Sequence, residues 1–165
     1  PQVIAFFGNR RGLSDAEGID NCVAVLEQVA PVAESEQVTL VVELLNSTVN
    51  HPDYQGDRTA FGVEVIKRVD SPRVKLLYDI YHMQIMEGDL AATLEANLDI
   101  ISHIQIAGVP GRHEPDHTQE INYRYLFAVL DGCGYDRWVA CESRPLAETL
   151  AGLSWAQPYG IALSD

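Results

Sequence analysis

The segment Lys75–Asp89, KLLYDIYHMQIMEGD, joins the end of a buried strand to polar residues that suit an active site. Residues 75–78 have the apolar and aromatic bias of a buried strand. Asp79 interrupts this bias where the strand should end, and His82 follows three residues later. Residues 87–89 resemble the start of a helix. A carboxylate at the carboxyl end of a parallel strand lies where α/β proteins place their chemistry.

The same alternation of strand and helix occurs five times along the chain. The expected strands are Gln2–Phe7, Val38–Val42, Lys75–Tyr78, His103–Ile106 and Trp138–Cys141. The first expected helix runs from Ser14 to about Glu34, with Ser14 and Glu17 as a capping box. The others are Thr59–Arg68, Asp89 through Ile101, Asn122–Leu130 and a weak helix around Leu146–Trp155, and an irregular tail follows. Apolar strands of this kind favour a parallel sheet covered by helices. Alternation alone fits both an open doubly wound sheet and part of an eight-stranded barrel, but the chain has no glycine-rich nucleotide-binding motif.

Composition limits the classes of function. A length of 165 residues suits one domain with a real core, and a net charge of −13 opposes binding to nucleic acid. The three cysteines show no metal or disulfide pattern, which favours a cytoplasmic protein, and no apolar run is long enough to span a membrane. The sequence begins at Pro1 without an initiating Met, so we expect an N-terminal portion to be missing.

Four strand ends carry side chains that can bind a metal. Glu43, Asp79, Gln105 and Glu142 lie at, or one residue inside, the carboxyl ends of successive expected strands. In a parallel barrel these ends converge on one mouth. Three carboxylates and an amide oxygen favour Mg²⁺, Mn²⁺ or Ca²⁺ over zinc. One such acid usually caps a helix, but four in succession are hard to explain as caps.

Further polar residues are candidates for substrate binding. His82 could donate to a substrate oxygen or orient a metal ligand. The loop GVPGRHEPDHTQE is too long and too charged for a simple connector, and its Arg112 suits a substrate carboxylate, with His113 beside it. Glu120 could cap a helix or reach the barrel mouth. The remaining histidines carry little signal, and His103 is expected to be structural (His51, His103, His117).

Several runs together resemble the hydroxypyruvate isomerase family of xylose isomerase-like TIM barrels. They are VVELLNS (41–47), LLYDIYHMQIMEGD (76–89), HIQIAGVPGRHEPD (103–116) with QEINY (119–123), and VACESRP (139–145). A full barrel has about eight βα units, and this chain resembles the part from the fourth strand onward. The resemblance implies one partial (β/α)8 barrel domain over residues 1–165, with about five of the eight units. Its open edges could be covered by a second copy of the chain.

The resemblance also implies an activity and residue roles. It assigns Glu43, Asp79, Gln105 and Glu142 as ligands of a divalent metal, Glu43 and Glu142 as the acid and base, and His82 and Arg112 as substrate-binding residues. The implied reaction converts hydroxypyruvate to tartronate semialdehyde by proton transfer through an ene-diolate. Gln105 stands where related epimerases usually have a histidine, which favours the isomerase branch.

Three alternatives remain open. A ketose 3-epimerase or a 2-oxo-tetronate isomerase would use the same residues on a longer substrate, and the less typical loop NSTVNHPDY (46–54) is where the substrate could differ. A DNA-repair enzyme like endonuclease IV would need a histidine-rich trinuclear zinc site and a basic surface, and this sequence has neither. An inactive barrel fragment with a structural or interaction role is the third alternative.

Overall fold

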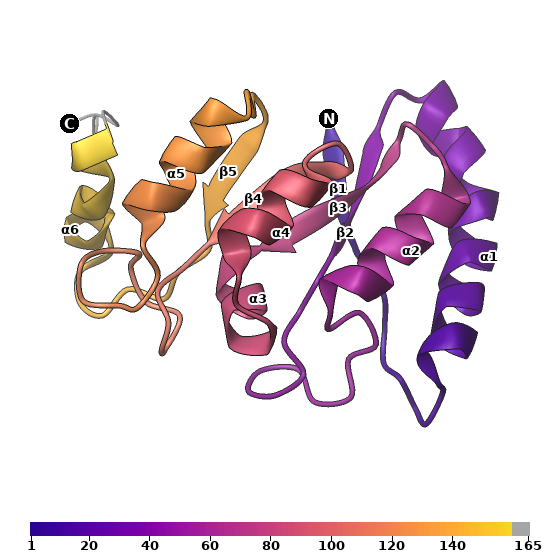
Figure 1. Cartoon of the computed structure of the whole chain (residues 1–165), viewed down its shortest axis with the longest axis horizontal. Coiled ribbons are helices and arrows are strands. Elements are labelled where there is room, and N and C mark those ends of the chain that lie inside the picture. Colours follow the sequence, from indigo (N-terminus) through magenta and orange to yellow (C-terminus); the bar gives the residue numbers. More distant parts are fainter. Residues whose placement is uncertain (160–165) are drawn as a thin grey trace.

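Five parallel strands form a single sheet in the computed structural model, which describes residues 1–159 (Figure 1). The strands follow chain order in the sheet, and each pairs in parallel with the next. Their bounds are β1 Gln2–Phe6, β2 Thr39–Glu43, β3 Val74–Asp79, β4 Ile101–Ile106 and β5 Trp138–Cys141. The predicted parallel arrangement of five βα units is therefore confirmed.

Helices cover one face of this sheet (Figure 1). Right-handed connections between strands that are neighbours in both chain and sheet place every connecting helix on the same side. The helices are α1 Asp15–Ser35, α2 Thr59–Val69, α3 Ile80–Met86, α4 Leu90–Asn97, α5 Tyr123–Gly132 and α6 Thr149–Gly152, and a 3-10 helix spans Leu153–Tyr159. This one-sided cover is typical of a barrel and excludes an open doubly wound sheet.

The sheet curls strongly, as a barrel wall does. Gln2 on β1 reaches across the inside of the sheet, and its Nε2 donates to the carbonyl and to Oγ of Ser102 on β4, both at 2.9 Å. The Nδ1 of His103 lies 2.8 Å from Gln2 Oε1. Two strands separate β1 from β4, so a flat sheet would keep these side chains well apart. The described chain is a half-barrel.

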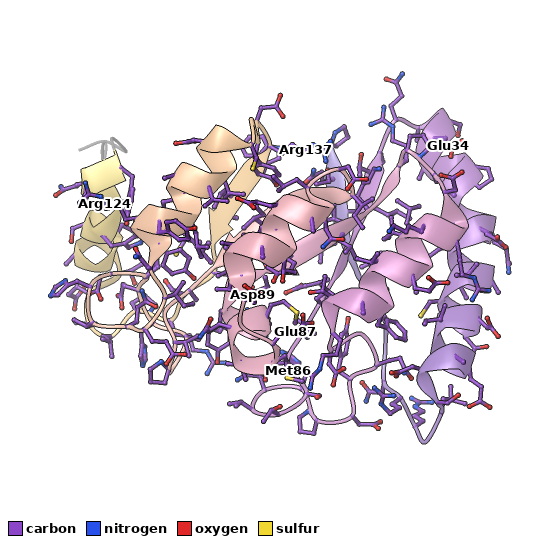
Figure 2. All side chains as sticks on the ribbon, viewed as in Figure 1. Glu34, Met86, Glu87, Asp89, Arg124 and Arg137 are labelled. Carbon is purple, nitrogen blue, oxygen red and sulfur yellow. The ribbon has the colours of Figure 1, made fainter. Side chains whose placement is uncertain are left out.

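Carboxylates fix the starts of two helices. Ser14 and Glu17 form the predicted capping box at the start of α1. Glu87, labelled beside α3 in Figure 2, accepts a hydrogen bond from the backbone N–H of Thr59 and so caps α2. At the other end of α1, Glu34 accepts a 2.6 Å hydrogen bond from the Ser71 hydroxyl (Figure 2). These contacts hold α1 and α2 at fixed positions along the sheet.

Two expected boundaries were wrong. The helix expected from Asp89 through Ile101 ends at Asn97, and Ile101 begins β4 instead. Ile101 pairs with Leu76 on β3 and is fully buried, so strand pairing overrides the helical spacing of the local sequence. The short helix α3 was not expected, and it begins directly after Asp79 because that side chain caps it.

The two outer strands are more exposed than their sequences predicted. Val3, Ile4 and Phe6 on β1 are 51%, 43% and 61% exposed, and Trp138 on β5 is 70% exposed. The central strands β2, β3 and β4 are almost fully buried. The prediction of a buried first strand was therefore wrong, because β1 and β5 form the open edges of the half-barrel.

The last described segment packs beside α5. The weak helix expected around Leu146–Trp155 consists of α6 and the 3-10 helix that follows it. Trp155 packs against the core, with its ring 6.1 Å from that of Tyr159. The irregular tail expected at the end of the chain lies, from residue 160 onward, outside the described residues. Within residues 1–159, no helix is both long and apolar enough to cross a membrane.

Candidate active site

The four predicted strand-end residues meet at the carboxyl edge of the sheet. Glu43 and Asp79 are the last residues of β2 and β3. Gln105, on β4, pairs with Asp79, and Glu142 directly follows β5. Glu43, Asp79 and Gln105 are buried, whereas Glu142 is exposed. The fold therefore brings together side chains that are up to 99 residues apart in the chain.

Gln105 lies between the two glutamates. With its amide nitrogen turned toward them, Nε2 donates to Glu43 Oε1 at 2.9 Å and to Glu142 Oε2 at 3.1 Å. Rotating the amide by half a turn presents Oε1 to the same space and adds an oxygen to those of the carboxylates. The side chain can thus either bridge the two glutamates or complete an all-oxygen donor set for a hard cation.

The two carboxylate oxygens of Asp79 have different roles: one caps a helix and the other faces the site. Oδ1 accepts a 3.1 Å hydrogen bond from the backbone N–H of His82 and caps α3. Oδ2 lies 3.5 Å from Arg112 Nη2 and 3.6 Å from His82 Nε2. The helix cap orients the carboxylate, because it fixes one oxygen and directs the other toward the site.

Arg112 places its guanidinium among the acids. Its Nη2 donates to Glu142 Oε2 at 2.6 Å, its Nε donates to the Glu142 carbonyl at 3.3 Å, and the guanidinium lies 5.3 Å from the centre of the Tyr81 ring. The backbone N–H of Arg144 also donates to the Arg112 carbonyl at 2.6 Å. The loop after β4 is therefore joined to the loop after β5, and one positive charge faces both Glu142 and Asp79.

Burial and like charge shift the acids toward their neutral forms. Burial, together with the negative charges of Asp79 and Glu142, raises the pKa of Glu43 to about 8, although Arg112 partly opposes this. Burial also raises the pKa of Asp79 to about 7, against the hydrogen bond from His82 and the charge of Arg112. Two carboxyl groups that titrate near neutrality in one site are typical of functional sites.

His82 is fully buried in the first turn of α3. Its Nδ1 accepts a 3.1 Å hydrogen bond from the backbone N–H of Asn46. Its Nε2 is buried and has no hydrogen-bond partner among the described residues. Burial and the nearby charge of Arg112 lower the pKa of His82 to about 3, so at neutral pH the ring is uncharged and its contact with Asp79 is not an ion pair.

The other two predicted substrate-binding residues have their hydrogen-bond partners outside the strand-end group. His113 Nδ1 lies 2.8 Å from the carbonyl of Arg144, in the joined loops. Glu120 Oε1 accepts a 3.1 Å hydrogen bond from Gln84 on α3. A role for either in substrate binding stays a prediction.

Sequence reasoning missed a layer of residues behind His82. Asn46 is fully buried and contacts the imidazole, and Tyr81 stacks edge-on against it with ring centres 5.1 Å apart. The ring of His51, which carried little signal in the sequence, lies 5.3 Å from that of His82. One signal was present: Asn46 follows Glu43 by three residues, as His82 follows Asp79.

A family model described as xylose isomerase-like TIM barrel matches residues 1–159. The chain belongs to the xylose isomerase-like TIM barrel family. This match confirms the resemblance to xylose isomerase-like TIM barrels that the sequence motifs indicate.

Curated members of this family carry isomerase names. The chain is 48% identical over 130 residues to a 2-oxo-tetronate isomerase of Cupriavidus necator. The aligned region covers 79% of this chain and 49% of that protein. The chain is 39% identical over 151 residues to the hydroxypyruvate isomerase of Escherichia coli, covering 90% and 57%. The chain thus spans about half the length of the curated relatives that it matches.

Two solved structures superpose well on the half-barrel. A crystal structure described as an AP endonuclease, family 2, from Brucella melitensis is 39% identical, with a TM-score of 0.89 over 96% of this chain and 60% of the other. A 3-keto-D-glucoside 4-epimerase from E. coli is 25% identical, with a TM-score of 0.77 over 95% and 63%. The arrangement of strands and helices in the described chain therefore recurs within these two longer chains.

The residues present in this family member suit a divalent cation. Glu43, Asp79 and His82 each place a donor atom within 4.8 Å of the others, and all three are buried. Gln105 and Glu142 extend this group with further oxygens. Buried carboxylates repel one another in a low-dielectric environment, and a cation relieves that repulsion. The donor set and its electrostatics thus fit a hard metal ion.

Proposed function

We propose that the protein is an isomerase of small hydroxy-carbonyl acids, which moves a proton between two adjacent carbons of its substrate. The convergence of Glu43, Asp79 and Glu142 with Arg112 at one edge of the sheet carries this proposal. The isomerase names of the curated relatives support it. A cytoplasmic location and a homo-oligomer remain predictions from the sequence.

Glu43 and Glu142 suit the two proton-transfer roles because they stand on either side of one position. Both lie within hydrogen-bond distance of the end of Gln105, so a substrate carbon above that amide would be reached by both carboxylates. One glutamate would remove the carbon-bound proton, giving the ene-diolate, and the other would return a proton to the neighbouring carbon, while the hydroxyl proton passes to the former carbonyl oxygen. Microscopic reversibility exchanges the two roles in the reverse direction.

Arg112 and His82 suit substrate binding. The guanidinium of Arg112 can bind a substrate carboxylate with two parallel hydrogen bonds, and it already contacts two carboxylates of the protein. The buried Nε2 of His82 has no hydrogen-bond partner within residues 1–159, and it lies 3.6 Å from Asp79 Oδ2, on the side of the site. An acid with a neighbouring carbonyl and hydroxyl group matches these two partners.

Glu43, Asp79, Gln105 and Glu142 would hold a divalent cation. When bound, it would supply positive charge that polarises the substrate carbonyl and keeps the glutamates ionised. Because the pKa of Glu43 is raised to about 8, the cation-free site keeps this carboxyl largely protonated at neutral pH.

Two substrates are candidates, hydroxypyruvate and a 2-oxo-tetronate, which differ by one carbon. The test supplies both acids and ketohexoses to the purified protein with Mn²⁺, and follows product formation and uptake of solvent deuterium. Turnover of a three- or four-carbon acid supports the proposal, and turnover of ketohexoses alone refutes it in favour of a 3-epimerase.

Substitutions can distinguish the catalytic roles of Glu43 and Glu142. Glu43→Gln and Glu142→Gln should each lower turnover by about a hundredfold or more, whereas Glu95→Gln on the exposed side of α4 should not change it. If only one glutamate is the base for a given substrate, its variant alone loses deuterium exchange. Full activity of Glu142→Gln would contradict the assignment.

The DNA-repair alternative makes a distinct prediction. One structural neighbour is described as an AP endonuclease, yet the net charge of −13 opposes binding to a phosphate backbone. Among residues 1–159, the group of possible metal ligands contains one histidine. Cleavage of an abasic duplex would favour the alternative, and failure to bind Mn²⁺ by calorimetry would favour an inactive fragment.

A further inference from the structure

The side chain of Asn46 has a single orientation that satisfies its neighbours. Its Oδ1 accepts hydrogen bonds from the backbone N–H groups of Val49 and Asn50, both at 2.9 Å. An amide nitrogen in that position would face two donors, so the oxygen is fixed there. Nδ2 must therefore point the other way, where it donates to Asn50 Oδ1 at 2.9 Å and lies 2.6 Å from His82 Nδ1.

This orientation decides which nitrogen of His82 carries the proton. Nδ1 faces two N–H groups of Asn46, the backbone at 3.1 Å and Nδ2 at 2.6 Å. A proton on Nδ1 would point at two donors, so Nδ1 is the acceptor. The single proton of the neutral ring is then on Nε2, which is buried and has no partner in the described part of the chain.

We propose that Asn46 is a positioning residue that fixes His82 as the Nε2–H tautomer, so that His82 donates a hydrogen bond to a substrate oxygen and does not bind the cation. A ring nitrogen that carries a proton has no lone pair for a metal. His82 belongs by distance to the possible metal cluster with Glu43 and Asp79, and the hydrogen-bond pattern removes it from the ligand set. The identity of the acceptor rests on the proposed isomerase function, whereas the tautomer does not.

The network behind His82 is closed, which makes the arrangement rigid. Asn50 Oδ1 accepts from Asn46 Nδ2 and also from the Tyr81 hydroxyl, at 2.8 Å. The Tyr81 ring in turn contacts both His82 and the Arg112 guanidinium. The loop that carries Asn46 therefore contacts His82 directly and is linked to Arg112 through the Tyr81 ring.

A second contact anchors the same loop to α3. The hydroxyl of Thr48 lies 3.1 Å from the sulfur of Met86, the last residue of α3, which is labelled in Figure 2. Since His82 stands in the first turn of α3 and Met86 at its end, the loop follows the whole helix. Movement of α3 relative to Asn46 is thereby restricted.

Nuclear magnetic resonance can test the tautomer directly. In protein labelled with ¹⁵N-histidine at pH 7.5 in EDTA, long-range ¹H–¹⁵N spectra should show His82 protonated at Nε2, with the signal assigned through a His82→Gln variant. Addition of Mg²⁺ should leave that proton in place. A proton on Nδ1, or its loss from Nε2 on addition of Mg²⁺, would overturn the proposal, and this result needs no variant of Asn46.

Substitution then tests the part played by Asn46. Asn46→Asp puts a carboxylate oxygen in place of Nδ2, so the proton should shift toward Nδ1 and kcat/KM should fall about 10- to 100-fold. Asn50→Ala is the matched control, because it removes a residue of the same type from the network but leaves both donors to Nδ1. It should keep the Nε2–H tautomer.

The outcomes separate this inference from the proposed function. An unchanged tautomer in Asn46→Asp would refute a positioning role for its side chain. If the tautomers are as expected but the protein turns over none of the tested acids, the isomerase function is refuted and the positioning role of Asn46 is still supported.

Discussion

Replacing Glu43 by glutamine should stabilise the cation-free protein at alkaline pH. The carboxyl of Glu43 is buried at 5% exposure, and its pKa is raised from 4.5 to about 8. Between these values the folded state binds more protons than the unfolded state, so stability falls as pH rises through this window. Below about pH 4.5 both states are protonated and the cost disappears.

The size of the effect follows from the same pKa. Ionising Glu43 in the folded protein costs on the order of 2–4 kcal/mol at pH 8, and less than about 1 kcal/mol at pH 5. Glutamine has nearly the same shape and no such cost, and the amide of Gln105 can rotate to pair with it. The free energy of unfolding of Glu43→Gln should therefore exceed that of the wild type by this amount at pH 8, and the two should be nearly equal at pH 5.

Urea unfolding in EDTA between pH 5 and pH 8.5 measures this difference. The pKa of Asp79 is raised to about 7, so the variant should keep a weaker decline of stability with pH. Glu95→Gln, an exposed change of the same chemistry on α4, should track the wild type. If wild-type stability rises with pH, or if Glu43→Gln and wild type coincide at pH 8, the electrostatic reasoning about the site is wrong.

Three further predictions concern the cation, the arginine and the core. Mn²⁺ at a hundred times its Kd should raise wild-type stability at pH 8 by about 2.7 kcal/mol, and Glu43→Gln should gain clearly less in the same thermal-shift assay. Arg112→Lys keeps the charge but loses the planar fork, so KM should rise about tenfold while kcat changes less in steady-state kinetics. Gly62→Ala would put a Cβ 2.8 Å from Leu76 Cδ2 and 3.0 Å from Leu44 Cδ2, so it should destabilise the protein by about 1–3 kcal/mol in urea.

The strand-end residues could be predicted from sequence because two local signals agree. An apolar run shows where a central strand lies, and the first polar residue after it shows where the strand ends. Glu43 and Asp79 satisfy both signals, and the structure places both as the last residues of their strands. Parallel pairing then brings such ends to one edge, whatever their separation in the chain.

Features that depend on distant neighbours could not be predicted in this way. The sequence of β1 is as apolar as that of β2, and only the position of β1 at the sheet edge leaves Phe6 exposed. The helical spacing that includes Ile101 is genuine, but pairing with β3 outweighs it. The role of Asn46 rests on its hydrogen-bond partners: a donor from its own loop, Val49 N–H, and an acceptor on α3, His82 Nδ1.

The asymmetry of the site follows from the half-barrel. Asp79 lies on the central strand, and its side chain is 2% exposed, whereas Glu142 follows the edge strand β5 and its side chain is 54% exposed. The same chemical group therefore stands in two environments: a raised pKa marks the buried acid, and an ion pair with Arg112 marks the open one. Anything that pairs with the free edge of β5 would remove water from the side of Glu142 and strengthen its contact with Arg112. Closing that edge is thus coupled to the electrostatics of the proposed acid–base pair, so the proposed isomerase activity should depend on what covers β5.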